Sequence, residues 1–471
     1  MMISSEPGAG RPNRIDALAI AALTLVMLLP AIANVFPLVF PDSGTYLGIA
    51  FGREYAIDRS SFYGFFLKPW VGLGGDRAGL WVAIAVQAAL IAACLWTTAR
   101  ALGLSGTRAL AVVAGIAALT SLPWHAGQFM PDAFTGVALL TAWLASSRDP
   151  EDNGAPLLWL AAIITALFHY THLPLLLMAA LASIAGQMLA GLPRRAALRR
   201  GVAALVAVAI TAAVQLGANA AVLNRAAVSP MGPMFLFARL HEDGLMAPWL
   251  ERHCGKGAPP ELCAIAPSLP NDSQQLLWDF ERSPLGRLIF HPASEAERWV
   301  WIERMDAANR GAIAEAPLKF IGGSLKGAAE QFVHFQAVDD LCPDSCRDVT
   351  GGVGFSLQRY RPATVAALHR SMQARGTTPK TAIRTVTTPV AAVGLLLLPW
   401  LGWIAWRRRD GPALALLAAL IAGLVVNAAL GGALSDVHDR YQSRLIWLAP
   451  MVAAMLAMRW KFFSTPVPRT G

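Results

Sequence analysis

The sequence predicts an all-α membrane protein, a polytopic bundle of about ten transmembrane helices with a mainly helical outer-face domain and juxtamembrane interfacial helices. Of its 471 residues, 55% are hydrophobic and only 15% are charged, whereas a soluble globular protein has about 25% charged residues. The mean hydropathy is +0.47, and the apolar residues are gathered into long runs that are nearly free of charge. Most of the chain must therefore use lipid as its solvent. The same composition excludes a disordered chain, a disulfide-dense small protein and a fibrous repeat.

The apolar runs define the expected spans. A helix that crosses a bilayer needs about 20 apolar residues and must satisfy its own backbone hydrogen bonds. Most of the runs reach or approach this length, whereas the third, fourth and fifth are short, and one of these could be re-entrant. The first run is longer than the apolar part of a signal peptide and no small-residue cleavage site follows it, which favours a retained helix. The runs cover residues 15–37, 79–99, 109–122, 132–147, 156–168, 173–191, 201–222, 385–406, 411–431 and 443–459.

The basic residues predict the orientation of these spans. Fifteen Lys and Arg residues lie in segments that would share the side of the N-terminus, against five in the short loops of the other side. Basic residues in short loops mark the cytoplasmic side, so both termini are expected in the cytoplasm, with the multi-pass chain in a bacterial-type inner (plasma) membrane. The net charge of +9 largely reflects this asymmetry. No nucleic-acid partner is indicated, because the large outer segment is neutral, with 17 basic and 17 acidic residues over 225–380.

The spans divide the chain into three parts. Residues 1–222 are expected to form an N-terminal transmembrane module with seven spans and a first outer loop at 38–78. Residues 223–384 have the composition of an ordinary soluble or interfacial domain and are expected to form an outer-face, periplasmic domain. Residues 385–471 are expected to form a C-terminal transmembrane module with three spans.

Four of the five cysteines lie in the predicted outer domain, which suggests two disulfides in an oxidising compartment. The pairing of Cys254 with Cys263 and of Cys342 with Cys346 is the simplest of three connectivities. A zinc site is the alternative, although no histidine follows a cysteine pair at the spacing of a zinc finger.

Two aromatic segments are expected to lie flat on the outer leaflet as amphipathic helices. In the first, Phe62, Phe65 and Phe66 recur at three- and four-residue steps, with Trp70 beyond them. The second covers 297–335 and forms a helical pair that is broken at a proline. The alternative is that these helices pack inside the outer domain. The residues that carry the second prediction are Trp299, Trp301, Ile302 and Phe320, with the break at Pro317.

Polar and charged residues collect at the predicted outer ends of the spans, where lipid would otherwise reject them. Every outer loop contributes carboxylate, imidazole or guanidinium groups, while the inner loops carry mostly Arg, Gly and Pro. This one-sided pattern predicts a functional site on the outer face. The groups are Asp42, Asp58 and Arg59 in the first loop, His125 and Asp132 between the third and fourth spans, His169, Tyr170 and His172 between the fifth and sixth, and Asp436, His438, Asp439, Arg440 and Arg444 between the last two.

Each of these groups also has a structural interpretation. Asp42 and Asp132 each follow a proline and could cap helices by accepting backbone N–H groups. The histidines could lie at the membrane interface or bind a metal ion, although only His169 and His172 share a helical spacing. The two arginines of the last junction could anchor the last helix in lipid head groups.

The order of these features resembles the GT-C glycosyltransferases, multi-spanning enzymes that include protein O-mannosyltransferases and lipid A aminoarabinose transferases. The shared order is an apolar first span, an aspartate just outside it, a long first loop with an aromatic juxtamembrane helix, and a last span entered through an Arg-Tyr pair. The resemblance covers the membrane portion, and its motifs are short. The matching segments are PDSGTYL at 41–47, DRSSFYGFFLKP at 58–69, MPDAFTG at 130–136, AIAEAPLKFI at 312–321 and HDRYQSRLIWLAP at 438–450.

The sequence departs from the better-known members of this family in two places. Asp42 is followed by Ser43 rather than by a second carboxylate, so no paired-acid motif supports a divalent metal, which stays an alternative to the absence of a cofactor. Tyr170, Thr171 and His172 stand where a Lys or Arg is expected near the donor phosphate.

The resemblance implies an enzyme that moves a hexose or pentose from a polyprenyl-phosphate carrier to a lipid, glycan or protein acceptor on the outer face. Asp42 would be the general base, with Asp132 beside it as a second catalytic-site carboxylate. Guanidinium groups bind phosphate with fixed geometry, and the carrier's lipid tail would lie in a groove between spans. The residues expected to bind substrate and phosphate are Arg59, Tyr46, His125, His172, Arg440, Tyr441 and Arg444.

Other functions share some of these features. A transporter or flippase of lipid-linked sugars should carry polar groups near the bilayer midplane and show repeated halves with broken helices. Here the charges stay at the outer ends and no internal repeat is found. An oligosaccharide ligase or another lipid-linked transferase would use the same outer-face chemistry, and a non-catalytic relative could act as an assembly subunit.

Overall fold

The computed structural model describes residues 14–52, 55–339, 341, 344–348 and 351–461. Within these ranges the chain folds into helices joined by short connections, and extended backbone pairs only at an isolated bridge between Leu38 and Gln128. This confirms the prediction of a helical protein, and the apolar helices indicate a multi-pass membrane protein.

In the described part of the chain, six helices are long and apolar enough to cross a membrane. Each coincides with one of the predicted spans, because a run of 18 or more apolar residues forms a helix that satisfies its own backbone in lipid. These helices are α1 (Arg14–Ala33), α4 (Asp76–Ala101), α9 (His172–Leu189), α10 (Arg194–Leu223), α22 (Lys380–Arg407) and α23 (Gly411–Leu434).

The predicted count of about ten spans is not confirmed, because the other four runs form helices of only 12 or 13 residues. At a rise of 1.5 Å per residue such a helix is about 20 Å long, less than the roughly 30 Å of the hydrocarbon layer. The last run is also divided, since one residue, Trp447, separates α24 (Asp439–Ile446) from the next helix. The short helices are α5 (Gly106–Ala118), α7 (Thr135–Ser146), α8 (Ala155–Leu167) and α25 (Leu448–Arg459).

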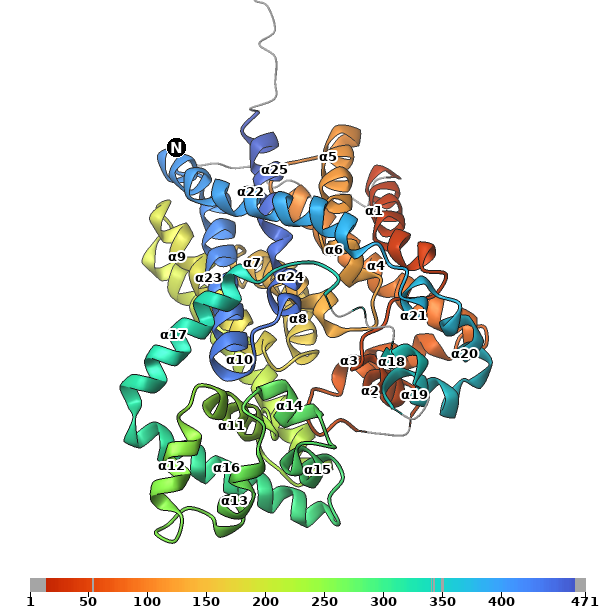
Figure 1. Cartoon of the computed structure of the whole chain (residues 1–471). Coiled ribbons are helices and arrows are strands. Elements are labelled where there is room, and N and C mark those ends of the chain that lie inside the picture. Colours follow the sequence, from red (N-terminus) through yellow and green to blue (C-terminus); the bar gives the residue numbers. More distant parts are fainter. Residues whose placement is uncertain (1–13, 53–54, 340, 342–343, 349–350, 462–471) are drawn as a thin grey trace, which may run out of the picture.

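Helix ends that the charge pattern assigns to one side of the membrane lie together in the bundle. Arg459, at the end of α25, pairs with Asp410 before α23 at 2.7 Å and donates to the carbonyl oxygen of Leu102 after α4. At the start of α1, Asp16 accepts a hydrogen bond from the Trp96 side chain of α4. Figure 1 shows the end of α25 at the top and the helices from α11 to α16 at the bottom, so these contacts lie far from the first part of the predicted outer domain.

The predicted outer domain is not a single unit. Its first part has a hydrophobic core of its own and lies at one end of the molecule in Figure 1. This part comprises α11 (Gly232–Glu242), α12 (Met246–His253), α13 (Pro260–Ile265), η2 (Ala266–Ser268), α14 (Ser273–Trp278), α15 (Pro284–Phe290) and α16 (Glu295–Glu315).

The remaining helices of the outer segment pack on the membrane bundle. Here α17 (Pro317–Val333) lies against α23, and the helices after it share the main core of the bundle. Ser356 of α19 donates a hydrogen bond of 2.7 Å to the carbonyl oxygen of Gly44 in the first outer loop. These helices are α18 (Asp344–Arg347), α19 (Gly352–Tyr360), α20 (Pro362–His369) and α21 (Met372–Arg375), and the first outer loop carries α2 (Ser43–Ala50) and α3 (Phe62–Val71).

The predicted interfacial segments behave differently. In the second segment the break at Pro317 is confirmed, but Trp299 and Trp301 of α16 are buried in the core of the outer domain. The prediction that α16 lies on the leaflet is therefore wrong, because its aromatic residues find protein partners. By contrast, Leu318 of α17 is 82% exposed. In the first segment Phe65 of α3 is exposed, whereas Phe62, Phe66 and Trp70 pack against the main core. The prediction that all four aromatic residues face the leaflet is therefore not confirmed.

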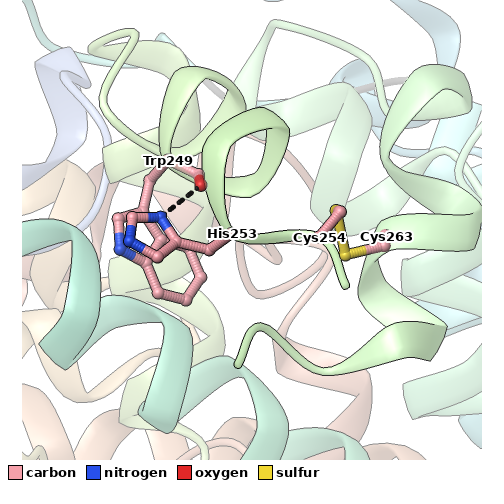
Figure 2. Close-up of a disulfide and its surroundings, with 4 residues drawn as sticks. All are labelled: Trp249, His253, Cys254 and Cys263. Atoms are coloured by element: carbon pink, nitrogen blue, oxygen red, sulfur yellow. Dashed lines mark hydrogen bonds between the residues drawn. A yellow bond between two sulfur atoms is a disulfide. The ribbon is translucent and has the colours of Figure 1, made fainter. Parts of the chain in front are cut away.

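A disulfide joins Cys254 and Cys263, as the sequence predicts. Figure 2 shows this bond beside the end of α12, where His253 stacks on Trp249 with ring centroids 4.9 Å apart. The predicted partner of Cys346, Cys342, lies outside the described residues.

The contact between α17 and α23 has a specific test. A Cβ atom on Gly327 would lie 2.1 Å from the carbonyl oxygen of Gly432. We expect Gly327→Ala to destabilise the protein by about 1–3 kcal/mol through overpacking, measured as a lower melting temperature in detergent. Gly322→Ala on the same helix is the control, because nothing lies within 4 Å of its added Cβ atom. Equal melting temperatures for the two variants would contradict this packing.

Candidate functional site

A cavity of about 380 Å³ opens where the segment between α1 and α3 meets α24 and the carboxyl end of α23. It has a charged side, formed by the first loop and α24, and an apolar side, formed by α11, α14 and the end of α23. Six of the predicted site residues line it together: Asp42, Tyr46, Arg59, Arg440, Tyr441 and Arg444.

Asp42 stands at the N-cap position of α2, but its side chain makes no capping hydrogen bond. Instead its Oδ2 atom lies 2.7 Å from Nη1 of Arg59 and 3.5 Å from Nη1 of Arg440. Burial opposes ionisation of this carboxyl, but the two guanidinium groups together hold its pKa below the ordinary value. The interpretation of Asp42 as a helix cap is therefore wrong, and the residue is an ionised carboxylate at the wall of the cavity.

Arg59 is held from two sides. Asp58 accepts hydrogen bonds from its Nε and Nη2 atoms, and Asp42 accepts from Nη1. Its guanidinium carbon also lies 5.8 Å from the centre of the Tyr46 ring. Asp58, which the sequence places beside Arg59, thus fixes the direction in which this arginine points.

Asp132 lies behind the cavity rather than in it. Its side chain is completely buried in η1 (Pro131–Phe134), and its Oδ1 atom lies 3.2 Å from Nη1 of Arg444 and 3.8 Å from Nε of Arg440. Its other oxygen has no hydrogen-bond partner among the described residues. Asp132 therefore orients two arginines and does not reach the cavity.

Almost all N–H groups of the Arg444 side chain donate hydrogen bonds to protein atoms. Its side chain is 2% exposed, and it donates to Oδ1 of Asn427 from Nε and Nη2 and to Oγ1 of Thr171 from Nη2. With the bond to Asp132, four of its five N–H groups are occupied. Asn427 was missed by sequence reasoning, although an amide within an apolar span is a signal that could have found it.

The predicted histidines do not gather around the cavity. His172 is buried, and its ring nitrogens lie within hydrogen-bond distance of Oγ1 of Thr135 and the carbonyl oxygen of Thr165. His125 lies behind Arg440 with its Nε2 atom 3.1 Å from Oγ of Ser443. The histidine that lines the cavity is His169. It lies at the same predicted junction as His172, between the fifth and sixth spans, but the sequence analysis predicts only His172 as a binding residue.

The described residues contain no group of three or more His, Cys, Asp or Glu residues arranged to hold a metal ion. Asp42 and Asp132 both face arginines, and these cations would compete with a metal for the carboxylate oxygens. The residues of this site therefore do not fit a paired-carboxylate metal centre.

The apolar side of the cavity is formed by residues that no sequence motif predicts as part of the site. Phe235 of α11 and Trp278 of α14 line it from the outer domain, with their ring centroids 6.3 Å apart. Leu430 and Leu434 line it from the last turns of α23. The cavity thus presents a charged surface opposite an apolar one, which suits a ligand with an anionic group and a hydrocarbon part.

The comparisons with known proteins add no relative. No protein-family model, curated protein or solved structure matches the chain.

The pairing of Asp132 predicts a large stability effect. Asp132→Asn leaves Arg440 and Arg444 without their buried counter-charge, and we expect a loss of about 3–5 kcal/mol, measured as a lower melting temperature. Asp149→Asn is the matched control, because Asp149 pairs with a half-exposed arginine, Arg199, at 2.6 Å, and exposed pairs contribute about 0–1 kcal/mol. Similar losses of stability in both variants would show that the buried pairing of Asp132 contributes no more to stability than an exposed ion pair does.

His125 predicts a pH dependence of stability. Burial lowers its pKa from 6.5 to about 4, so the unfolded chain binds a proton at higher pH than the folded chain. The stability that depends on neutral His125 is therefore complete above pH 6.5 and is lost as the pH falls toward 4. We expect His125→Gln to flatten the fall in melting temperature over this interval. The exposed His334→Gln is the control, and unchanged slopes in both variants would contradict the assignment.

Proposed function

We propose that this protein is a membrane glycosyltransferase of the GT-C type, which transfers a sugar from a polyprenyl-phosphate carrier to an acceptor on the extracytoplasmic face. The observation that carries the proposal is the ionised carboxylate of Asp42 placed against Arg59 and Arg440 at the wall of a cavity whose opposite side is apolar. A polyprenyl-phosphate sugar has the matching parts: a hydrocarbon tail, an anionic phosphate and a sugar.

Asp42 is the proposed general base. Its Oδ2 atom faces both arginines, while its Oδ1 atom accepts no hydrogen bond from the described residues. As the acceptor oxygen attacks the anomeric carbon, its proton moves to the carboxylate of Asp42. The bond between the anomeric carbon and the phosphate oxygen breaks, and its electrons stay on the polyprenyl phosphate that leaves.

Arg440 is the proposed phosphate ligand. Its distances of 3.5 Å to Asp42 and 3.8 Å to Asp132 exceed the 2.7 Å between Arg59 and Asp42. Arg440 also lines the cavity, so a phosphate bound there would reach its guanidinium group. Arg444 and Asp132 are positioning residues in this proposal, since both are buried and bonded to each other. Guanidinium groups stabilise the charge that develops on the leaving phosphate.

The apolar side of the cavity would receive the first units of the carrier. Phe235, Trp278, Leu430 and Leu434 line that side, and burial of hydrocarbon against them is favourable by roughly 25 cal/mol per Å². The disulfide between Cys254 and Cys263 in the same outer domain supports an extracytoplasmic location, because such bonds persist in oxidising compartments.

The test is a transfer assay on purified full-length protein reconstituted in liposomes with a polyprenyl-phosphate hexose labelled in the sugar. Asp42→Asn keeps the size of the side chain but removes the base, and we expect the release of polyprenyl phosphate to slow by about 100- to 10,000-fold. Asp306→Asn is the control, because Asp306 is an exposed carboxylate of α16 that pairs with Arg310.

Three results would overturn the proposal or parts of it. A wild-type rate in Asp42→Asn would remove Asp42 as the base. Movement of the intact donor across sealed vesicles without release of polyprenyl phosphate would identify a transporter. A chain that neither releases nor moves a panel of such donors would favour an assembly subunit.

A further inference from the structure

A second cavity of about 490 Å³ lies near the other end of α23. Since α23 has 24 residues, this cavity is about 36 Å from the first along the helix axis. It sits between two helical turns that touch each other: a Cβ atom on Gly411 would lie 3.5 Å from the side chain of Ala190. Its lining consists of Met188, Leu189, Ala190, Gly191, Trp406, Arg407 and Arg409.

The lining is cationic and contains no carboxylate. Among the described residues, no carboxylate lies within ion-pair distance of Arg407 or Arg409, and the neighbouring Asp410 is engaged by Arg459 at 2.7 Å and by the Trp460 side chain at 3.0 Å. The carboxyl ends of α9 and α22 also lie at this cavity, and each contributes roughly half a negative charge. Two arginines exceed these two half charges, so the cavity is positive.

One of the two arginines is placed at a conformational cost. Arg409 follows the end of α22 with a φ of 51°, in the left-handed region where glycine is favoured. Glycine would adopt this backbone conformation without strain, but the sequence has an arginine here, and its side chain lines the cavity.

The rim of the cavity is apolar and exposed. Leu189, Met188 and Trp406 are all exposed, and Trp403 lies one turn earlier on α22, with Arg407 over its ring at 5.6 Å. Tryptophan at the end of an apolar helix is typical of the boundary between membrane and water. The two guanidinium groups therefore lie at the depth of lipid head groups, with hydrocarbon-compatible side chains next to them.

We infer that this cavity binds the phosphate of an anionic phospholipid, with Arg407 and Arg409 as its ligands and the exposed apolar rim against the first carbons of the acyl chains. Guanidinium groups bind phosphate oxygens with paired hydrogen bonds. A zwitterionic lipid would bring an ammonium group to a lining that offers two cations and no carboxylate. A soluble phosphate would not use the apolar rim. This site does not depend on the proposed glycosyl transfer.

The test is lipid binding to purified full-length protein, followed by native mass spectrometry as phosphatidylglycerol or phosphatidylcholine is added. An arginine near a membrane surface strengthens binding of anionic lipid about fivefold, so we expect Arg407→Gln with Arg409→Gln to weaken phosphatidylglycerol binding about 30-fold. Binding of phosphatidylcholine should not change. The control is Arg194→Gln with Arg195→Gln, which removes the same charge from exposed residues at the start of α10, outside the lining.

The alternatives give distinct results. Equal losses in the two double variants would show diffuse attraction and overturn the site. Equal affinity of the wild type for the two lipids would do the same. Displacement of phosphatidylglycerol by inorganic phosphate at equal concentration would identify a soluble-anion site instead. Melting curves without lipid establish that each variant is folded, and the single Arg409→Gln variant, with an expected fivefold loss, replaces the double variant should it unfold.

Discussion

The architecture around the first cavity depends on a series of ion pairs in which the charges alternate in sign: Asp58, Arg59, Asp42, Arg440, Asp132 and Arg444. Removing one ion from water costs several kcal/mol unless a counter-charge and hydrogen bonds replace the solvent. No single helix can supply this alternation. The start of α2, the loop before α3, η1 and α24 must therefore meet, although Asp42 and Arg440 are 398 residues apart in the sequence. Segments from the beginning and the end of the sequence are therefore held together at this site.

The members of this series of ion pairs differ in their access to solvent. Asp132 and Arg444 are sealed, with 0% and 2% of their side chains exposed, whereas Asp42 retains 25%. A sealed pair is rigid, because any rearrangement would leave a buried ion unpaired. An open carboxylate can exchange one partner for another. The sealed Asp132 thus orients Arg440 and Arg444, and the more open Asp42 is the member of the network that a ligand can reach. A preorganised site requires both properties.

Sequence reasoning succeeded where the membrane itself imposes the constraint. Six of the predicted spans form long apolar helices, because lipid demands length and low polarity. The predicted span at α7 is not confirmed, because this helix has only twelve residues and all of them are buried. A helix surrounded by protein need not match the thickness of the bilayer. Asp42, Arg59 and Arg440 were found because charges at helix ends are conspicuous. His172 was misplaced because only side-chain direction separates it from His169, and Trp278 was missed because no periodic pattern reveals which face of a small domain meets the bundle.

The two ends of α23 show why a count of arginines does not establish what they do. At the outer end each arginine of the network faces an aspartate, so the cluster is neutral and can be buried. At the other end Asp410 is engaged by Arg459, and two arginines of the run at 407–409 line a cavity without a carboxylate. In the sequence this run reads only as a topological signal. The structure shows that Asp410, the nearest carboxylate in the sequence, is paired with Arg459, 49 residues away. The positive charge of Arg407 and Arg409 is therefore not neutralised by Asp410.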